Sequence, residues 1–266
     1  MATPTTTRGV LGKLPPRVDL RTLELARYVD REVLPAPPPA LDLSRGVGEW
    51  PMYGNDRVGD CTTAAAAHMI EAWSEAAAGS AAELPEDAVL AAFDAVKIVD
   101  PLTGDEGAVE LDVLRYWRRR GIGGHRVGAF AAVAARDDDL VRTGAYLFGG
   151  LFIGLQLPLR AQEQAVWDWT GRLDGPDAPG SWGGHAVNVV AYDDAGLTVV
   201  TWGVLQRLTW SFWQRYCDEA WAIISPDFLA GGRSPQGFDL PALEHDLALV
   251  TGGGVGSTEP PKRAPS

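Results

Sequence analysis

The chain has 266 residues, of which 46% are hydrophobic, and it carries a formal net charge of −12. This apolar content excludes a chain that is disordered along its whole length, and the acidic balance argues against nucleic acid as the main partner, because such a surface repels a phosphate backbone. No apolar run approaches the roughly 18 residues that a membrane-spanning helix needs, so we expect no membrane insertion.

The region before the first strongly apolar segment is expected to be peripheral. Residues 1–17 are polar, contain proline and hold no apolar stretch typical of a secretion signal, which predicts a tail and a cytoplasmic protein. Apolar residues at helical spacing predict one short helix between Leu20 and Val33. The prolines of residues 34–40 end it, because proline removes backbone donors and disfavours helix. We therefore assign residues 1–35 to an N-terminal tail and short helix.

Three helices are predicted next. The first begins near Gly59 and is apolar on so many sides that it must be buried. The second covers about 86–99 after a proline, and the third covers about 109–120 and ends at a glycine. An acidic stretch around the start of the third helix has no spacing typical of a metal site and is interpreted as a solvated loop. Its acids are Asp105, Glu106, Glu110 and Asp112.

After Arg136 the periodicity changes from helix to strand. Apolar or alternating runs predict strands at 150–157, 185–194, 197–202 and 221–225, and Trp210–Tyr216 has the apolar face of a short buried helix. Helices followed by strands indicate an α+β fold with two lobes, a helical lobe at about 36–140 and a β lobe at about 141–228. Residues 229–251 are expected to form an extension with a short helix, and residues 252–266 a flexible tail that only a partner would order.

The chain contains two cysteines, Cys61 and Cys217. They are far apart and form no Cys-x-x-Cys pair, so they predict neither a disulfide framework nor a zinc site, and we expect no metal or cofactor. Cys61 stands at the start of the buried helix, where free N–H groups and the helix dipole stabilise a thiolate and lower its pKa. The alternative is a small buried apolar residue. Cys217 is interpreted as a packing residue.

Four histidines are present, and one of them suits catalysis best. His68 lies two helical turns beyond Cys61 and cannot reach the sulfur, whereas His125 and His245 have polar surroundings and are interpreted as solvated. His185 follows two glycines at the mouth of a predicted β-hairpin. A structural role stays open for this residue. A cysteine at a helix start and a histidine on a separate strand are, however, the arrangement of thiol proteases.

Further motifs accompany this pair. Asn55 stands six positions before Cys61, Gly59 precedes the helix, and the segments GAVELDVLRYWRRRGI, RTGAYLFGGLFIGLQL and GGHAVNVVAYDD follow in order. Over about residues 34–224 these motifs resemble papain-like cysteine proteases, in which a glutamine at the place of Asn55 completes the oxyanion hole. The resemblance implies a two-lobe papain-like fold whose central helix carries Cys61 and whose antiparallel β lobe carries His185.

The segment VVTWG departs from the family pattern, because the asparagine that orients the histidine is absent. Counting forward from His185 puts Thr201 at that place, whereas aligning the Trp-Gly pair puts Val200 there. Strand parity favours Val200, which shares a face with Trp202, and a bulge would reconcile the two alignments. We expect Thr201, because its hydroxyl can bond a histidine, with an unsupported Cys61–His185 dyad as the alternative. The family's long inhibitory propeptide and its disulfides are expected to be missing.

The resemblance implies a cysteine peptidase that cleaves a peptide or protein substrate. Cys61 would be the nucleophile, His185 the general base, Asn55 an oxyanion donor and Thr201 the residue that orients the histidine. One alternative is an amidase or acyltransferase that uses the same dyad. Another is a non-catalytic papain-like interaction module, for example on a phage particle, which would make the protein virion-associated. The absent asparagine favours the module, and the intact set of Asn55, Cys61 and His185 favours the enzymes.

Overall fold

The computed structural model describes residues 9–28, 36–229 and 234. Nine strands in this part of the chain form one sheet. They are β1 (Leu23–Glu24), β2 (Leu41–Asp42), β5 (Ala129–Ala132), β6 (Leu151–Leu157), β7 (Val166–Trp167), β8 (Gly183–Tyr192), β9 (Gly196–Thr201), β10 (Val204–Thr209) and β11 (Cys217–Ile224). Their order is β1-β5-β11-β6-β8-β9-β10-β7, with β2 paired to β8. The central pairs are antiparallel, as expected, and the short pairs β1–β5 and β10–β7 are parallel.

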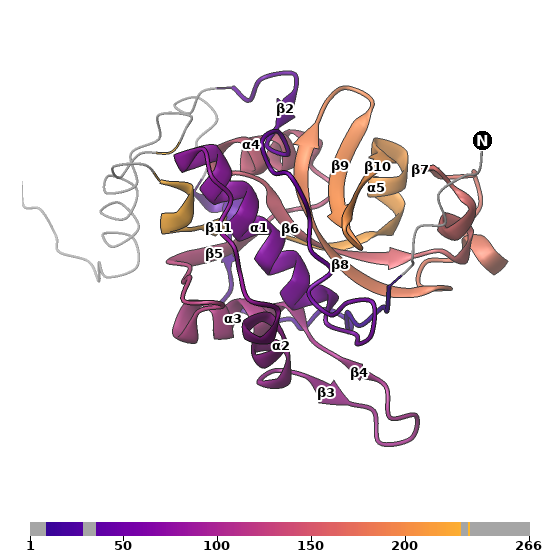
Figure 1. Cartoon of the computed structure of the whole chain (residues 1–266). Helices are drawn as coiled ribbons and strands as arrows, with labels where there is room; N and C mark the ends of the chain where they lie inside the picture. The colour runs from indigo at the N-terminus through magenta and orange to yellow at the C-terminus, as the bar shows by residue number, and fades with distance from the viewer. Residues whose placement is uncertain (1–8, 29–35, 230–233, 235–266) are drawn as a thin grey trace, which may run out of the picture.

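Five α-helices surround this sheet in the described residues. They are α1 (Cys61–Ala78), α2 (Glu86–Asp94), α3 (Glu110–Arg120), α4 (Asp138–Phe148) and α5 (Trp210–Tyr216). A separate hairpin of β3 (Ile98–Val99) and β4 (Glu106–Gly107) projects from the helical side of the molecule (Figure 1). The helices at the positions predicted for residues 59–120 are thus present. The second is shorter than predicted, because residues 98–99 pair with β4 instead of continuing the helix.

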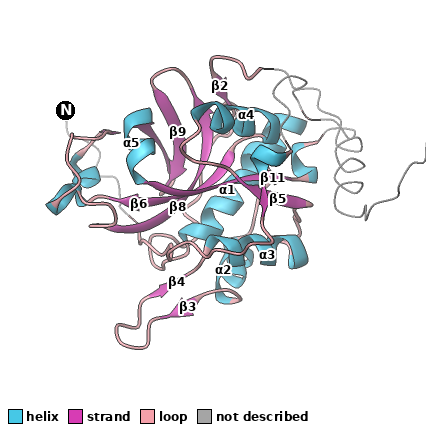
Figure 2. Ribbon diagram, turned by 180° about the vertical axis from the view of Figure 1, so that it is seen from behind, coloured by secondary structure: helices cyan, strands magenta, loops and turns pink. Residues whose placement is uncertain are grey.

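The sheet is covered on both faces. Helix α1 lies against one face together with α3 (Figure 1), and α4 and α5 cover the other, which is turned toward the viewer in Figure 2. Strand β6 shows how its sequence produces this arrangement. Phe152 belongs to the apolar cluster of α1 and α3, whereas Ile153 and Leu155 belong to the cluster of α4 and α5. Successive side chains of a strand point to opposite faces, so a strand buried on both sides is apolar without interruption.

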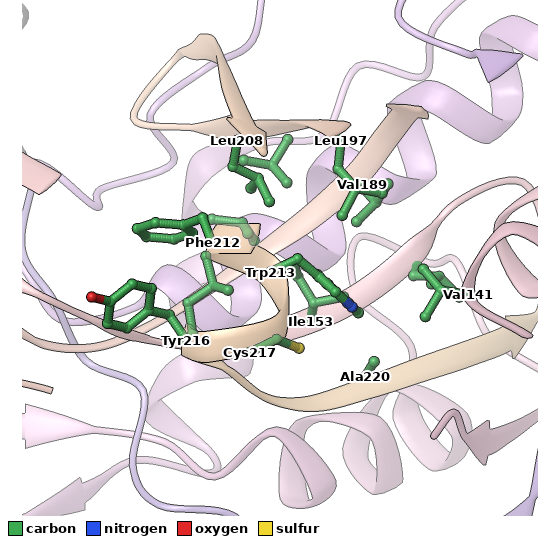
Figure 3. Packing of buried hydrophobic residues seen from close by; sticks show 14 of the residues in the cluster. Val141, Ile153, Val189, Leu197, Leu208, Phe212, Trp213, Tyr216, Cys217 and Ala220 are labelled. Atoms are coloured by element: carbon green, nitrogen blue, oxygen red, sulfur yellow. The ribbon is translucent and has the colours of Figure 1, made fainter. Parts of the chain in front are cut away.

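Cys217 lies inside the second of these clusters. Figure 3 shows its sulfur among Ile153, Trp213 and Ala220, and its side chain is 3% exposed. The interpretation of Cys217 as a packing residue is therefore confirmed. The α+β fold with a central cysteine-bearing helix and a histidine-bearing sheet is confirmed as well, since Cys61 begins α1 and His185 lies on β8.

The N-terminal expectations are wrong in the described residues. The region predicted as a helix between 20 and 33 contains strand β1 and a single 3-10 turn at Leu25–Arg27, because the backbone pairs with β5 while Leu25 enters the core. Strand β10 was not predicted.

The extension expected at 229–251 and the tail expected at 252–266 lie outside the described residues, apart from residues 229 and 234. None of the helices described has the length and apolar composition that a bilayer span requires.

Candidate active site

Cys61 occupies the first position of α1, and it is 1% exposed. Its sulfur accepts a hydrogen bond from the backbone N–H of Ala186, with 3.5 Å between nitrogen and sulfur. Burial raises the pKa of the Cys61 thiol to about 12, and the backbone N–H groups of Ala186 and Gly12 offset only part of this effect. The lowered pKa of Cys61 that was expected from the helix start is therefore wrong for this conformation. Loss of hydration destabilises the thiolate more than the nearby N–H dipoles stabilise it.

His185, the residue before Ala186, is also 1% exposed. Its Nε2 lies 2.7 Å from the hydroxyl oxygen of Thr201, and its ring stacks on Trp202 with 4.5 Å between ring centroids. Its other nitrogen, Nδ1, is buried without a hydrogen-bonding partner in the described residues. Burial lowers the pKa of His185 to about 3. Thiol and imidazole are thus both neutral, and no hydrogen bond joins them in this conformation.

The residue beside the imidazole is Thr201 and not Val200. Val200 packs with Ala72 and Trp50 on another side of the strand. The parity argument fails because β9 ends at Thr201 and Trp202 has a positive φ of 46°. Trp202 and Gly203 form the two-residue turn between β9 and β10, where both central residues adopt the left-handed conformation. The turn brings the indole back over the ring that Thr201 contacts from the strand.

Asn55 is brought to the same region, but its amide is already used. It is 3% exposed, and its Nδ2 donates to the carbonyl oxygens of Val10, at 2.8 Å, and Val58, at 3.2 Å. The Asn55 amide, which was expected to donate to a substrate, is therefore already bonded to carbonyl oxygens of this chain. Asp60 lies between Asn55 and Cys61 in sequence and is fully buried, which raises the pKa of its carboxyl to about 7.

Val10 belongs to a stretch that we call the crossing segment, residues 9–14, which contacts both lobes. On the helical side, the N–H of Leu14 donates to the Ala108 carbonyl at 2.9 Å, and the N–H of Ala108 donates to the Gly12 carbonyl at 2.8 Å. On the sheet side, the N–H of Lys13 donates to the Gly184 carbonyl at 3.2 Å. The tail expected over residues 1–17 is therefore wrong for this stretch, because its backbone hydrogen bonds are made with the fold itself.

The backbone of the crossing segment lies directly against residues next to Cys61 and His185. A Cβ atom on Gly12 would lie 1.7 Å from the carbonyl oxygen of Gly59, and one on Gly9 would lie 2.2 Å from Cδ1 of Trp202. Glycine at both positions lets the segment lie on the residues that flank Cys61 and His185. The side chains of Cys61 and His185 are thereby shielded from water.

The remaining sequence-based interpretations have mixed outcomes. His68 is buried with its Nε2 2.7 Å from the Pro51 carbonyl oxygen, away from the sulfur. His125 pairs with Asp227 at 2.7 Å, and His245 lies outside the described residues. Glu110 was interpreted as part of a solvated loop and is instead fully buried as the first residue of α3. Sequence reasoning missed Lys13 altogether, although a lone lysine within an apolar stretch, VLGKLP, is a signal of a specific partner.

Comparison with solved structures identifies the fold. The chain is similar to xylellain, a cysteine protease from Xylella fastidiosa, with a TM-score of 0.61 and 15% identity over 84% of this chain and 99% of that one. It is also similar to the cysteine protease and lectin-like domains of Cwp84 from Clostridium difficile (0.57, 12%, over 83% and 56%) and to procathepsin B S9 from Trypanosoma congolense (0.55, 14%, over 82% and 86%). No protein-family model matches the sequence, and no curated protein does. At these identities the likeness shows that the chain has the papain-like cysteine protease fold.

Proposed function

We propose that this chain is a cysteine peptidase that cleaves peptide bonds through Cys61 and His185. One observation carries the proposal: the imidazole is held by Thr201 on one nitrogen and by Trp202 on its face, while the other nitrogen is left without a partner. A buried polar atom without a partner costs free energy, so a purely structural histidine would be expected to use both nitrogens. The next residue along β8 donates its N–H to the Cys61 sulfur, and this link between β8 and the thiol supports the choice of His185 as its partner.

The crossing segment has to leave before catalysis begins. Its departure would hydrate the thiol and the imidazole, so that both pKa values return toward their ordinary range and a proton can pass from Cys61 to Nδ1 of His185. The thiolate would then attack the substrate carbonyl. Asn55, released from Val10, would donate its amide to the developing oxyanion, and such a donor contributes about 3 kcal/mol to transition-state stabilisation. His185 would return the proton to the leaving amine, and water would hydrolyse the thioester.

Thr201 replaces the amide that this position has in the resembled family. A hydroxyl both donates and accepts, so it can serve either tautomer of His185 and fixes the ring less strictly than an amide does. Trp202 would keep water from the hydrogen bond between Thr201 and His185, because the indole lies against the ring. Together they orient the imidazole without contacting the substrate.

A non-catalytic role is the second candidate, and the sealed site favours it. Cys61 is almost fully buried and its pKa is raised, so a chain that never opens would keep the fold as an interaction module only. An acyltransferase would share all of the site residues with a peptidase. The three functions therefore differ in what happens to an acyl group on Cys61.

The test is to trap that acyl group. The full chain is incubated with a peptide active ester and quenched in acid, and intact mass and peptide mapping locate any thioester. We expect an adduct on Cys61 that is absent in Cys61→Ala, is present in the matched variant Cys217→Ala and decays in water. Diversion of the acyl group to an added amine in preference to water would identify an acyltransferase. Absence of any adduct would contradict the proposal and favour the module.

A further inference from the structure

A short stretch that follows the crossing segment, residues 17–21, lies along the outer side of α3. Arg17 donates to the carboxylate of Asp112 at 2.6 Å. Asp19 accepts a hydrogen bond from Arg115. Asp112 and Arg115 are three positions apart on α3, so they share one side of the helix, away from its buried side. Alternate residues of the stretch are therefore fixed to α3 by ion pairs.

The residues between and beyond these anchors are apolar and point outward. Val18 is 85% exposed and Leu20 is 97% exposed. Among the other large apolar residues of the described chain, only Leu102, at 93%, is more than half exposed. A single exposed apolar side chain needs no explanation, but two that fixed neighbours hold outward present apolar area on a rigid surface.

Arginines gather on the same side of α3. Arg119 lies one helical turn beyond Arg115 and extends the side to which the stretch is fixed. Arg126 lies at the end of the helix, since a Cβ atom on Gly121 would be 3.1 Å from its Cγ. We call the whole surface the arginine face. It is formed by exposed residues only, namely Val18, Leu20, Arg118, Arg119, Arg120 and Arg126.

Most of this positive charge has no partner. Arg119 donates to the Arg115 carbonyl oxygen at 3.2 Å, as cations in a last helical turn commonly do. The side chains of Arg118, Arg120 and Arg126 make no ion pair or hydrogen bond with any other described residue. Neighbouring like charges repel each other, and the chain as a whole carries a net charge of −12. A local excess of cations on an acidic protein therefore indicates a surface for an anionic partner.

The hairpin of β3 and β4 exposes apolar residues of its own. It extends away from the body of the molecule (Figures 1 and 2), and its two strands pair only with each other. Ile98, Val99 and Leu102 are all exposed on it. An isolated two-stranded hairpin is marginally stable in water. A surface that covered these three side chains would stabilise the hairpin.

The hairpin also carries negative charge. Lys97, which directly precedes it, lies 2.9 Å from Asp94 and 2.9 Å from Glu106. Asp100 and Asp105, at the turn, are exposed and have no cation beside them in the described residues. Oδ1 of Asp100 accepts backbone N–H groups of the turn, which fixes the loop but leaves the charge uncompensated. The hairpin and the arginine face are thus complementary in charge, and both present exposed leucine.

The two surfaces belong to one end of the helical lobe. The hairpin leads into the start of α3, and the arginine face lies along the outer side and the end of the same helix. Within one chain they do not cover each other, because both stay exposed. A second copy carries the same pair of surfaces. In a two-fold arrangement the hairpin of each copy would meet the arginine face of the other, and the contact would be made twice.

We propose that the arginine face is the docking surface for the β3–β4 hairpin of a second copy of this chain, so that two copies form a two-fold dimer. Leu102 and Leu20 supply apolar area to this contact, and the arginines neutralise Asp100 and Asp105. Neither surface contains Cys61. The proposal therefore goes beyond the peptidase function and is independent of it.

The first experiment measures the oligomeric state of the full chain. Sedimentation velocity is recorded over a range of protein concentrations at low and at high salt. We expect a monomer–dimer equilibrium whose dissociation constant rises at least about tenfold at high salt, because salt screens opposite charges across an interface. A chain that stays monomeric overturns the proposal, and so do assemblies that grow beyond two copies. Binding of the monomer to phosphatidylglycerol vesicles would assign the arginine face to a lipid surface instead.

The second experiment reverses the charge of each surface. Arg118→Glu combined with Arg119→Glu should raise the dissociation constant of the dimer at least about a hundredfold, since like charges then face each other. Asp100→Arg combined with Asp105→Arg should do the same. An equimolar mixture of these two double variants should form a dimer again, because each hairpin then meets an arginine face, native or reversed, of opposite charge.

The control for charge reversal is Arg27→Glu combined with Arg45→Glu. Both arginines are exposed, each pairs with a nearby acid, and both lie outside the two surfaces. This variant should dimerise as the wild type does. Dimers that survive either reversal on the proposed surfaces overturn the proposal. It is also overturned if both double variants keep the wild-type unfolding midpoint and yet stay monomeric in the mixture.

The third experiment tests the apolar part of the contact. Leu102→Ser and Leu20→Ser should each weaken the dimer at least about tenfold, because each removes apolar area that the second copy covers. Leu173→Ser, at another exposed leucine, is the control and should have no effect. Unchanged dissociation constants for Leu102→Ser and Leu20→Ser would show that the second copy does not cover these residues and would overturn the proposal.

Discussion

Cys61 and Cys217 are both free, buried thiols whose pKa values are raised by burial, yet they lie in different surroundings. Cys217 sits within an apolar cluster (Figure 3). Its S–H donates to the Glu219 carbonyl oxygen at 3.3 Å. Cys61 lies where the helical lobe meets the sheet, and its cover is the crossing segment. Burial alone therefore does not separate a packing cysteine from the nucleophile that we propose. The neighbouring groups and the segment that covers each thiol are what differ.

The surroundings of Cys61 also cost more stability. His185 has a buried nitrogen without a partner, Trp202 adopts a left-handed backbone conformation, and Asp60 is a buried acid with a raised pKa. Each of these features is unfavourable by itself, and such features gather at sites where function requires them. If this comparison is correct, substitutions near Cys61 should alter activity strongly and sometimes stabilise the fold.

The largest expected effect separates the two thiols directly. Cys61→Ala should abolish peptide hydrolysis, a loss of about 10⁴-fold or more, because no other group can form the acyl-enzyme. Cys217→Ala should retain activity at temperatures where it is folded, although its cavity lowers the unfolding midpoint. Initial rates with a fluorogenic peptide mixture measure both. Activity that survives Cys61→Ala would break the comparison.

The next effect concerns Asp60 and stability. Burial raises its folded-state pKa to about 7, whereas an unfolded aspartate titrates near 3.9, so the fold favours the protonated acid. This contribution to stability is complete below about pH 4 and is lost as the pH rises through 7. Asp60→Asn should therefore be nearly neutral at pH 4 and stabilising at pH 8, on the order of 2–4 kcal/mol. Urea unfolding at both pH values measures this difference, and an equal effect at both would contradict the assignment.

A smaller effect is expected at Asn55. Asn55→Ala should lower kcat by roughly a hundredfold, because it would remove the oxyanion donor that we propose. The same change deletes the hydrogen bond to the Val10 carbonyl, so alkylation of Cys61 should become faster while hydrolysis becomes slower. Gln206→Ala, which removes a half-buried side-chain amide bonded to the Ala165 and Arg207 carbonyls, is the control and should change neither rate. A hydrolysis rate that stays at the wild-type level would make Asn55 a turn residue only.

The smallest effect is expected at Thr201. Thr201→Val keeps the volume but removes the hydroxyl beside His185, which should reduce kcat/KM by about tenfold, since such a hydrogen bond contributes ~1 kcal/mol. The pH at which activity reaches half its maximum should shift too, because Thr201 acts through the imidazole. Thr198→Val on the same strand is the control. Identical kinetics for the two variants would show that Trp202 alone orients the ring.

The sequence was sufficient for those parts of the site that depend on local pattern. The buried helix with Cys61 at its start follows from its apolar composition, and the strand with His185 follows from its alternation. Choosing between Thr201 and Val200 was harder. Parity misled because the strand ends at Thr201 and Trp202 turns back through a left-handed conformation. A Trp-Gly pair predicts such a turn less strongly than an Asn-Gly pair does.

The crossing segment and the acids around Lys13 depend on contacts between distant parts of the chain. Lys13 meets Asp218 across about two hundred positions, and the bulge that brings Asp218 and Glu219 together is a property of pairing and not of composition. Glu110 resembled its solvated acidic neighbours in sequence, and only the packing of α3 against the sheet buries it. Such contacts are set by the tertiary fold, so a single sequence did not reveal them.

The most direct test of the account is the alkylation of Cys61 after displacement of the crossing segment. In Gly12→Ala the new Cβ atom would overlap the Gly59 carbonyl, whereas Gly48→Ala, the control, places a Cβ atom in open space. Iodoacetamide is added at pH 7, and the modification of each cysteine is followed by peptide mapping. We predict that Cys61 reacts at least about a hundredfold faster in Gly12→Ala than in the wild type or Gly48→Ala, because hydration lowers its pKa from about 12, and that Cys217 stays unreactive. Equal reactivity of Cys61 and Cys217 in Gly12→Ala would contradict the account.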